Sequence, residues 1–370
     1  MQLLYYYKRT YYVLILLLCV QLFVSCNTKS RYNPDVLKKF EVGHIDDTIS
    51  GTPLATHLFI EPMGIEVMDD YLVVIENSKS DRIFSVYGIE EDSIIARFGQ
   101  IGNAKNEFSW APTTCYFGRE NGDLLMIVPD LQLTAKVVNL SKSIRENNSI
   151  VSRLLKHGLM TERYYWISDD NSVTSLFITS DDPRDHVYFP PKFILKEKNK
   201  TREVSFYPST ISCPNYDIVT LLYNSEMRIS PQKDIIVEGL LYMNMINILD
   251  VEKSTTIGVI EKQTFSLEDV EKHQNDIQWL NEHINICTRS LSVSENYIMV
   301  LQDRRKMVEK VTEEFNANRL VLIFNHEGDY LKSFCIKDKV DNIAFSERYK
   351  MLFGIRQDGT VLKYDMSQLL

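Results

Sequence analysis

The fold is decided by residues 65–99, which read IEVMDDYLVVIENSKSDRIFSVYGIEEDSIIARFG. Four apolar runs rich in β-branched and aromatic residues alternate here with short turns of Asp, Asn, Ser or Gly, and each run has the length of a strand. Four successive strands within about 40 residues have the size of one blade of a β-propeller. The stretch therefore predicts a blade with strands at 65–68, 71–75, 82–87 and 93–99.

The same strand-and-turn unit recurs along the chain, which indicates a ring of blades that stack on one another. The third blade is expected to use 164–167, 173–178 and 186–189 as strands. The further blades are expected at 113–140, 227–249, 290–334 and 342–364.

The sixth blade shows only three strands, so an N-terminal strand is expected to complete it. Such closure joins the two ends of the chain and leaves no open sheet edge. Leu58-Phe59-Ile60 is the expected strand. The predicted fold class is all-β, a six-bladed β-propeller over residues 41–370 with an N-terminal strand that closes the last blade.

A pair of β-sandwiches is the alternative architecture. It is disfavoured because one pattern of inner strand and short turn recurs in distant parts of the chain. The pattern appears in Val67-Met68-Asp69-Asp70-Tyr71, Val293-Ser294-Glu295-Asn296-Tyr297 and Phe345-Ser346-Glu347-Arg348-Tyr349.

Two segments interrupt the β pattern. Ser266 and Asp269 fit a capping box, and apolar residues at helical spacing follow, so a short helical insertion is expected over 266–284. The charged stretch from Arg304 to Asn316 is interpreted as a solvated loop, with a rim that contacts a partner as the alternative.

The composition excludes several classes of protein. Of 370 residues 44% are hydrophobic and 25% are charged, which is near the average for globular proteins and unlike disordered, collagenous or multi-span membrane chains. The formal net charge is −9, so no nucleic-acid partner is expected.

The first 25 residues are interpreted as a signal peptide. Lys8 and Arg9 precede an apolar run over 11–24, which is shorter than the roughly 20 residues that cross a bilayer as a helix. An uncleaved anchor is disfavoured because those two basic residues would then lie at membrane depth. An ordinary cleaved signal is the other alternative.

The segment Phe23-Val24-Ser25-Cys26 resembles a bacterial lipobox. This resemblance implies cleavage between Ser25 and Cys26, lipidation of Cys26 and a membrane contact through the lipid anchor, followed by a polar linker over 26–40. The expected location is the envelope of a Gram-negative bacterium. The periplasmic side is favoured over the cell surface, because no acidic residue directly follows Cys26.

Two parts of the chain resemble the TolB-like six-bladed β-propeller family of bacterial lipoproteins. The first has Phe98-Gly99, then Gly102, then Glu107-Phe108, and the second covers 321–331. The resemblance extends over most of residues 55–365. It implies the fold and an exported location, and it brings no catalytic residues with it.

The cysteines Cys115, Cys213, Cys287 and Cys335 lie far apart without a Cys-x-x-Cys spacing, which argues against a zinc cluster. An exported compartment permits disulfides between them. Buried free thiols are the favoured interpretation, and the sequence leaves the choice open.

No catalytic, metal or cofactor site is expected. None of the seven histidines pairs at the spacings that place two ligands on one face of a strand or helix. The common hydrolase, zinc-protease and phosphate-loop motifs do not occur in the sequence. The acidic clusters at 169–171 and 181–185 fit no calcium loop and are interpreted as solvated turns.

Two weaker site hypotheses follow from short patterns. Tyr164-Tyr165-Trp166 either fills the core between blades, which is favoured, or forms a platform on which a ligand stacks. Thr48 and Ser93 each follow Asp and precede an apolar residue, a pattern that resembles a bacterial O-glycosylation acceptor.

The function expected from these observations is a lipid-anchored envelope propeller that binds a protein or glycan ligand through loops on one rim. One alternative is a propeller hydrolase or lyase that acts on a glycan or peptide at the central channel. Another is a structural component of an envelope assembly.

Overall fold

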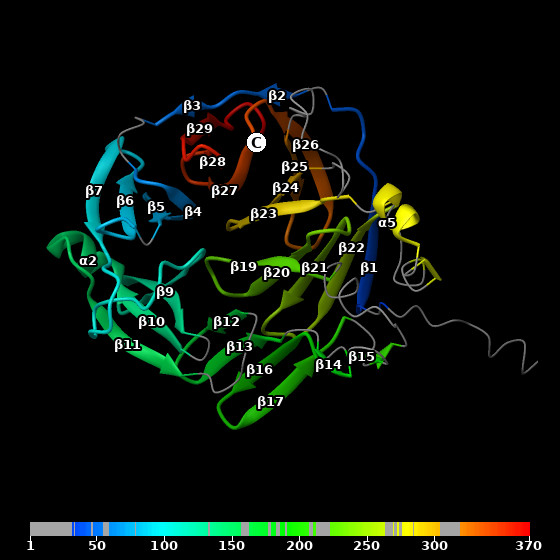
Figure 1. The fold of residues 1–370 in the computed structure, drawn as a ribbon, viewed down its shortest axis with the longest axis horizontal. Coiled ribbons are helices and arrows are strands. Elements are labelled where there is room, and N and C mark those ends of the chain that lie inside the picture. The colour runs from blue at the N-terminus through cyan, green and yellow to red at the C-terminus, as the bar shows by residue number, and fades with distance from the viewer. Residues whose placement is uncertain are drawn as a thin grey trace, which may run out of the picture.

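The chain forms a ring of six blades around a central axis (Figure 1). Each blade is an antiparallel sheet of four strands, and two blades gain a fifth, parallel strand at the outer edge. The predicted six-bladed, all-β propeller is therefore confirmed. The structure is a computed structural model, and it describes residues 32, 34–45, 47–54, 59–77, 79–131, 134–156, 163–176, 179–182, 186–188, 191–206, 210–211, 223–262, 269, 272–273, 276–283, 285–303 and 319–370.

Blade 1 has the four strands expected from the sequence, and blade 2 contains two elements that the sequence did not indicate. These are the helix α2 (Leu140–Glu146) and the outer strand β11 (Val151–Lys156). Asn139 caps the helix, because its side chain accepts a hydrogen bond from the Lys142 amide at 2.9 Å. The other strands are β4 (Pro62–Met68), β5 (Tyr71–Glu76), β6 (Phe84–Gly88), β7 (Ser93–Phe98), β8 (Tyr116–Glu120), β9 (Asp123–Leu131) and β10 (Thr134–Asn139).

The prediction for the outer half of blade 3 was wrong. The expected strand at 186–189 supplies β15 (His186–Tyr188), which pairs with β14 (Thr179–Asp182) and β18 (Thr210–Ile211) in a separate small sheet. Phe193 and Leu195 are instead buried in the third strand of the blade, where they pair with β13. The blade is built from β12 (Arg163–Trp166), β13 (Asn171–Ser175), β16 (Phe193–Glu197) and β17 (Lys200–Val204).

Blades 4, 5 and 6 follow the predicted order of strands. Blade 4 also has an outer strand, β22, which was not expected from the sequence. Their strands are β19 (Ser225–Ile229), β20 (Ile235–Leu240), β21 (Met245–Asp250), β22 (Thr256–Glu261), β23 (Thr288–Val293), β24 (Ile298–Gln302), β25 (Arg319–Phe324), β26 (Tyr330–Ile336), β27 (Val340–Ser346), β28 (Met351–Arg356) and β29 (Val361–Asp365).

The N-terminal segment runs along the outside of the ring across three successive blades (Figure 1). β1 (Val36–Phe40) pairs in parallel with β22, and β2 (Thr48–Ile49) pairs in parallel with β26. β3 (Thr52–Pro53) then pairs with β29 and completes blade 6. The end of the expected polar linker is thus a strand. Its Phe40 is buried and packs edge-on against Phe324 of blade 5, with the ring centroids 5.1 Å apart.

Closure of the last blade by an N-terminal strand is therefore found, but the expected strand was wrong. Phe59 and Ile60 lie outside any strand, and Leu58 lies outside the described residues. β3 has only two residues, so it carries no alternating pattern from which a strand could be predicted. Leu54, just after β3, is buried in the core between blades 6 and 1.

The helical insertion is found in part. α5 (Ile277–His283) lies within the predicted range, while Ser266 and several other residues of 266–284 lie outside the described part of the chain. The charged stretch 304–316 also lies outside it. Within the ranges given above, no helix has both the length and the apolar character needed to cross a bilayer.

The core lies between neighbouring blades. One cluster joins Leu72 and Tyr87 of blade 1 to Phe353 of blade 6, and others join blades 1 and 2, 2 to 4, 4 and 5, and 5 and 6. Because each blade buries its apolar faces only against its neighbours, the ring must close for the first and last blades to be covered.

Candidate binding site at the channel mouth

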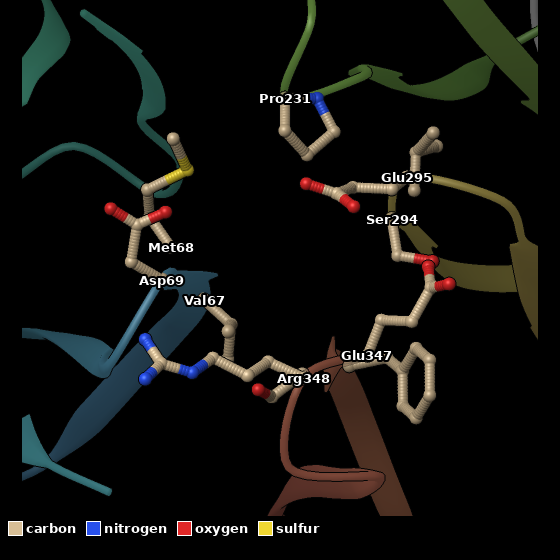
Figure 2. Close-up of a pocket in the computed structure, with 11 residues that line it drawn as sticks. Val67, Met68, Asp69, Pro231, Ser294, Glu295, Glu347 and Arg348 are labelled. Carbon is tan, nitrogen blue, oxygen red and sulfur yellow. The ribbon is translucent and has the colours of Figure 1, made fainter.

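The first strand of each blade lies nearest the axis, and at one end of the ring these strands turn back into the second strands. A cavity of about 450 Å³ opens there, between the turns of blades 1, 4, 5 and 6 (Figure 2). We call this cavity the channel mouth. It is lined by Val67, Met68, Asp69, Pro231, Val293, Ser294, Glu295, Phe345, Ser346, Glu347 and Arg348.

Equivalent positions of three blades meet at the channel mouth. The recurring pattern of inner strand and turn, which argued against sandwiches, places an apolar residue in the wall and an acidic residue two positions later. The acidic residues are Asp69, Glu295 and Glu347. The repeat of the fold thus brings three carboxyl groups to one opening.

Polar contacts between neighbouring turns hold this rim together. Arg348 of blade 6 forms an ion pair with Asp70 of blade 1, and Arg119 of blade 2 forms one with Asp69. The hydroxyl of Tyr349 also donates to Asp70, at 2.8 Å. These pairs are exposed, so they set the positions of the turns more than they stabilise the fold.

A second, smaller cavity of about 40 Å³ lies against the channel mouth and shares five of its lining residues, Val67, Met68, Pro231, Val293 and Phe345. Polar residues in and beside this cavity are connected by ion pairs and a hydrogen bond. Glu66 lies 3.1 Å from Nε of Arg228 and accepts a hydrogen bond from the Thr114 hydroxyl at 3.0 Å. Arg228 also contacts Glu226 at 3.1 Å.

Burial controls the ionisation of two side chains that line the smaller cavity, Glu66 and Cys115. It raises the pKa of the Glu66 carboxyl above its ordinary value, although Arg228 and Thr114 act in the opposite direction. Burial also raises the pKa of the neighbouring Cys115 thiol, with the Glu66 charge as a second cause. A protonated, buried thiol is a weak nucleophile, so Cys115 is a core residue here.

One lysine side chain of blade 4 contacts residues of both blade 2 and blade 3. Lys233 of blade 4 lies over the Trp166 ring, 4.3 Å from its centroid, and donates to the Ile167 carbonyl at 3.0 Å. Gly118 leaves room for it, since a Cβ at that position would lie 2.5 Å from the Lys233 nitrogen. Burial lowers the pKa of Lys233 to about 8.

The aromatic triplet lies mainly in the core. Tyr165 and Trp166 are buried among blades 2 to 4, and Tyr164 is half-buried against the same cluster. This placement fits the favoured interpretation, in which the triplet fills space between blades.

The other predicted site residues are spread over the molecule or fall outside its described part. Thr48 is exposed in β2, and Ser93 is exposed at the start of β7. Ser25, Cys26 and Cys213 lie outside the described residues. Cys115 is a buried free thiol, and Cys287 is also buried. Among the described residues, no group of three His, Cys, Asp or Glu side chains could hold a metal ion.

The sequence analysis did not identify the channel mouth or the Glu66–Arg228 pair beneath it. A signal was present, since charged residues at Glu66, Glu226 and Arg228 interrupt otherwise apolar first strands at alternate positions. Glu66 of blade 1 and Arg228 of blade 4 lie on first strands, which are the innermost strands of their blades, so they could have been grouped once the blades were aligned.

The chain is similar to one protein family and to several solved structures. The family model described as TolB-like 6-blade propeller-like matches residues 46–348. A candidate exported protein from Bacteroides fragilis aligns with a TM-score of 0.47 and 10% identity over 87% of each chain. A member of the DUF4221 family from Bacteroides vulgatus aligns with a TM-score of 0.52 and 9% identity, over 86% of this chain and 96% of that one. No curated protein matches the sequence.

Proposed function

Because the chain belongs to the TolB-like 6-blade propeller family, we propose that it is a lipid-anchored protein of a Gram-negative cell envelope that binds a partner at the channel mouth. The observation that carries the proposal is the cavity itself, where the turns of four blades surround about 450 Å³. Turns on a rigid scaffold are the usual place for binding residues, and this volume suits a ligand or an inserted side chain.

The proposed lipid anchor would hold the ring close to the membrane. Tyr32 packs into blade 4, where its hydroxyl donates to Asn247 and Gly258 leaves the space that it occupies. Six residue steps separate it from Cys26, so the tether spans at most about 22 Å when fully extended. We place the protein on the periplasmic side, and a protein or glycan would reach the mouth from the surrounding envelope.

Capture from the envelope tests the binding role. The full-length protein, solubilised in detergent, is used to capture partners from an envelope extract of its own bacterium and is applied to a glycan array. Glu295 is exposed at the channel mouth, so E295R should remove the captured partner without affecting the fold. The control E203R changes an exposed residue of the outer strand β17 and should capture as the wild type does.

Three results would count against this proposal. They are no specific partner in either assay, equal capture by E295R and the wild type, or cleavage of a bound glycan or peptide, which would favour the hydrolase or lyase alternative. The anchor is tested separately by metabolic labelling with an alkyne fatty acid, which should label the wild type and leave C26A unlabelled. Labelling of C26A would refute the anchor.

A further inference from the structure

The basic residues at the channel mouth are already neutralised. Arg348, which lines the mouth, is paired with Asp70, and Asp69 of the mouth is paired with Arg119 of blade 2. Each of these two positive charges is thus matched by one carboxylate of a neighbouring blade. Among the residues that the structure describes, neither arginine is left unpaired for an anionic ligand.

Two further carboxylates at the channel mouth have no basic partner among the residues that the structure describes. Glu347 accepts hydrogen bonds from the backbone and side-chain amides of Asn296, at 3.0 Å and 2.5 Å, and these donors carry no charge. Glu295 is exposed, and its carboxylate extends toward the centre of the opening (Figure 2). Neither residue takes part in an ion pair within the described part of the chain. The rim therefore has an excess of negative charge.

A polar group in the wall of the cavity is a second indication of a ligand, and it does not depend on this charge. Ser346 lines the channel mouth and is only 2% exposed, and its hydroxyl has no hydrogen-bond partner among the described residues. A buried hydroxyl without a partner is unfavourable, and a donor from a ligand would relieve that cost. The wall around it is apolar, formed by Val67, Val293 and Phe345.

We infer that the channel mouth receives the lysine or arginine side chain of a protein partner. This inference rests on the proposed function and narrows it to one class of ligand. The methylene stem of such a side chain suits the apolar wall, and its charged head suits Glu295, Glu347 and the Ser346 hydroxyl. Lipid phosphates, nucleic acids and acidic glycans would bring a second negative charge to a negative rim.

Side-chain analogues test the inference on the full-length protein in detergent. Butylguanidinium and butylammonium represent the two side chains, and butylurea is the neutral control of nearly the same shape. Titration calorimetry or saturation-transfer NMR should detect both cations and show binding of butylurea at least tenfold weaker. High salt should weaken the binding of both cations, because salt screens the charges of an exposed rim.

Variants locate the bound cation. E295Q should lower the affinity for butylguanidinium about threefold, as expected for the loss of one exposed charge pair. E295K should lower this affinity further through repulsion. E203Q removes an exposed carboxylate in β17 and should bind as the wild type does. Thermal unfolding of each variant confirms that the fold is kept.

The inference is wrong if neither cation binds, if butylurea binds as tightly as the cations, or if E295K binds as the wild type does. These results separate it from the proposed function. If E295R still abolishes capture of an envelope partner, the mouth remains the binding site and only the cationic ligand is refuted. If capture is also unaffected by E295R, the proposed function fails as well.

Discussion

The backbone amide of Leu54 donates to the Val361 carbonyl at 2.9 Å, which joins the N-terminal segment to the last strand of the ring. This bond continues the pairing of β3 with β29. The Leu54 side chain then enters the core between blades 6 and 1, where it is 4% exposed. The first and last parts of the chain thus share one sheet and one apolar cluster.

Leu54→Ala should destabilise the protein by about 2–5 kcal/mol, because it removes a buried side chain at the closure of the ring. Chemical unfolding followed by circular dichroism measures this. Leu331→Ala is the control, since Leu331 is 48% exposed, and it should change the free energy of unfolding by less than about 0.5 kcal/mol. Equal effects of the two substitutions would contradict the closure.

Gly64→Ala should destabilise the contact between blades 1 and 2. A Cβ at this position would lie 2.5 Å from the Thr113 carbonyl oxygen, which is backbone and cannot move aside easily. We expect a loss of about 1–3 kcal/mol in the same unfolding experiment. Gly43→Ala adds the same methyl group where no atom lies within 4 Å and should be nearly neutral. A neutral Gly64→Ala would show that the blades do not approach so closely.

The buried Glu66 should make stability fall as the pH rises. Its native pKa is raised, so the carboxyl holds its proton more tightly in the folded chain than in the unfolded chain. Unfolding then releases a proton between the ordinary pKa of 4.5 and the raised native value, and the free energy of unfolding decreases across that window. Glu66→Gln should remove this slope, whereas Glu203→Gln should keep it. A slope unchanged in Glu66→Gln would refute the assignment.

Lys233 should have the opposite effect at higher pH. Burial lowers its native pKa to about 8 from an ordinary value of 10.5, so the unfolded chain binds the proton more tightly within that range. Its contribution to the free energy of unfolding therefore increases as the pH rises from 8 to 10.5, and Lys233→Met should abolish it.

Reductive methylation with ¹³C-formaldehyde measures this lysine directly. One dimethyl-lysine resonance, absent from Lys233→Met, should titrate near pH 8. Lys262→Met removes an exposed lysine that directly follows β22 and should leave that resonance in place. Titration of the Lys233 resonance above pH 10 would contradict its burial over Trp166.

The sequence sufficed for most of the ring because the middle strands of several blades are apolar and buried along almost their whole length. β5, β6, β24 and β25 are examples, and there the strand pattern follows directly from the burial. Blade 3 was misassigned because Val187 and Tyr188 resemble a strand as strongly as Phe193-Ile194-Leu195 does. Only pairing with β13 selects the second, and pairing is a tertiary property.

The channel mouth could be predicted only in part. The repeated turns containing Asp69, Glu295 and Glu347 were visible in the sequence, and equivalent positions of a propeller must lie around one axis. What could not be predicted is how each charge is neutralised. The pairing of Arg348 with Asp70, which leaves Glu295 without a basic partner in the described structure, depends on the packing of blade 6 against blade 1.

Site-specific photo-cross-linking tests the central claim, that the channel mouth is the binding surface, most directly. A benzoylphenylalanine is placed at position 295 of the full-length protein in its own cells, and the same residue at position 203 is the control. We predict a specific adduct from position 295 after irradiation and none from position 203. An adduct from position 203 alone, or none from position 295, would contradict the account.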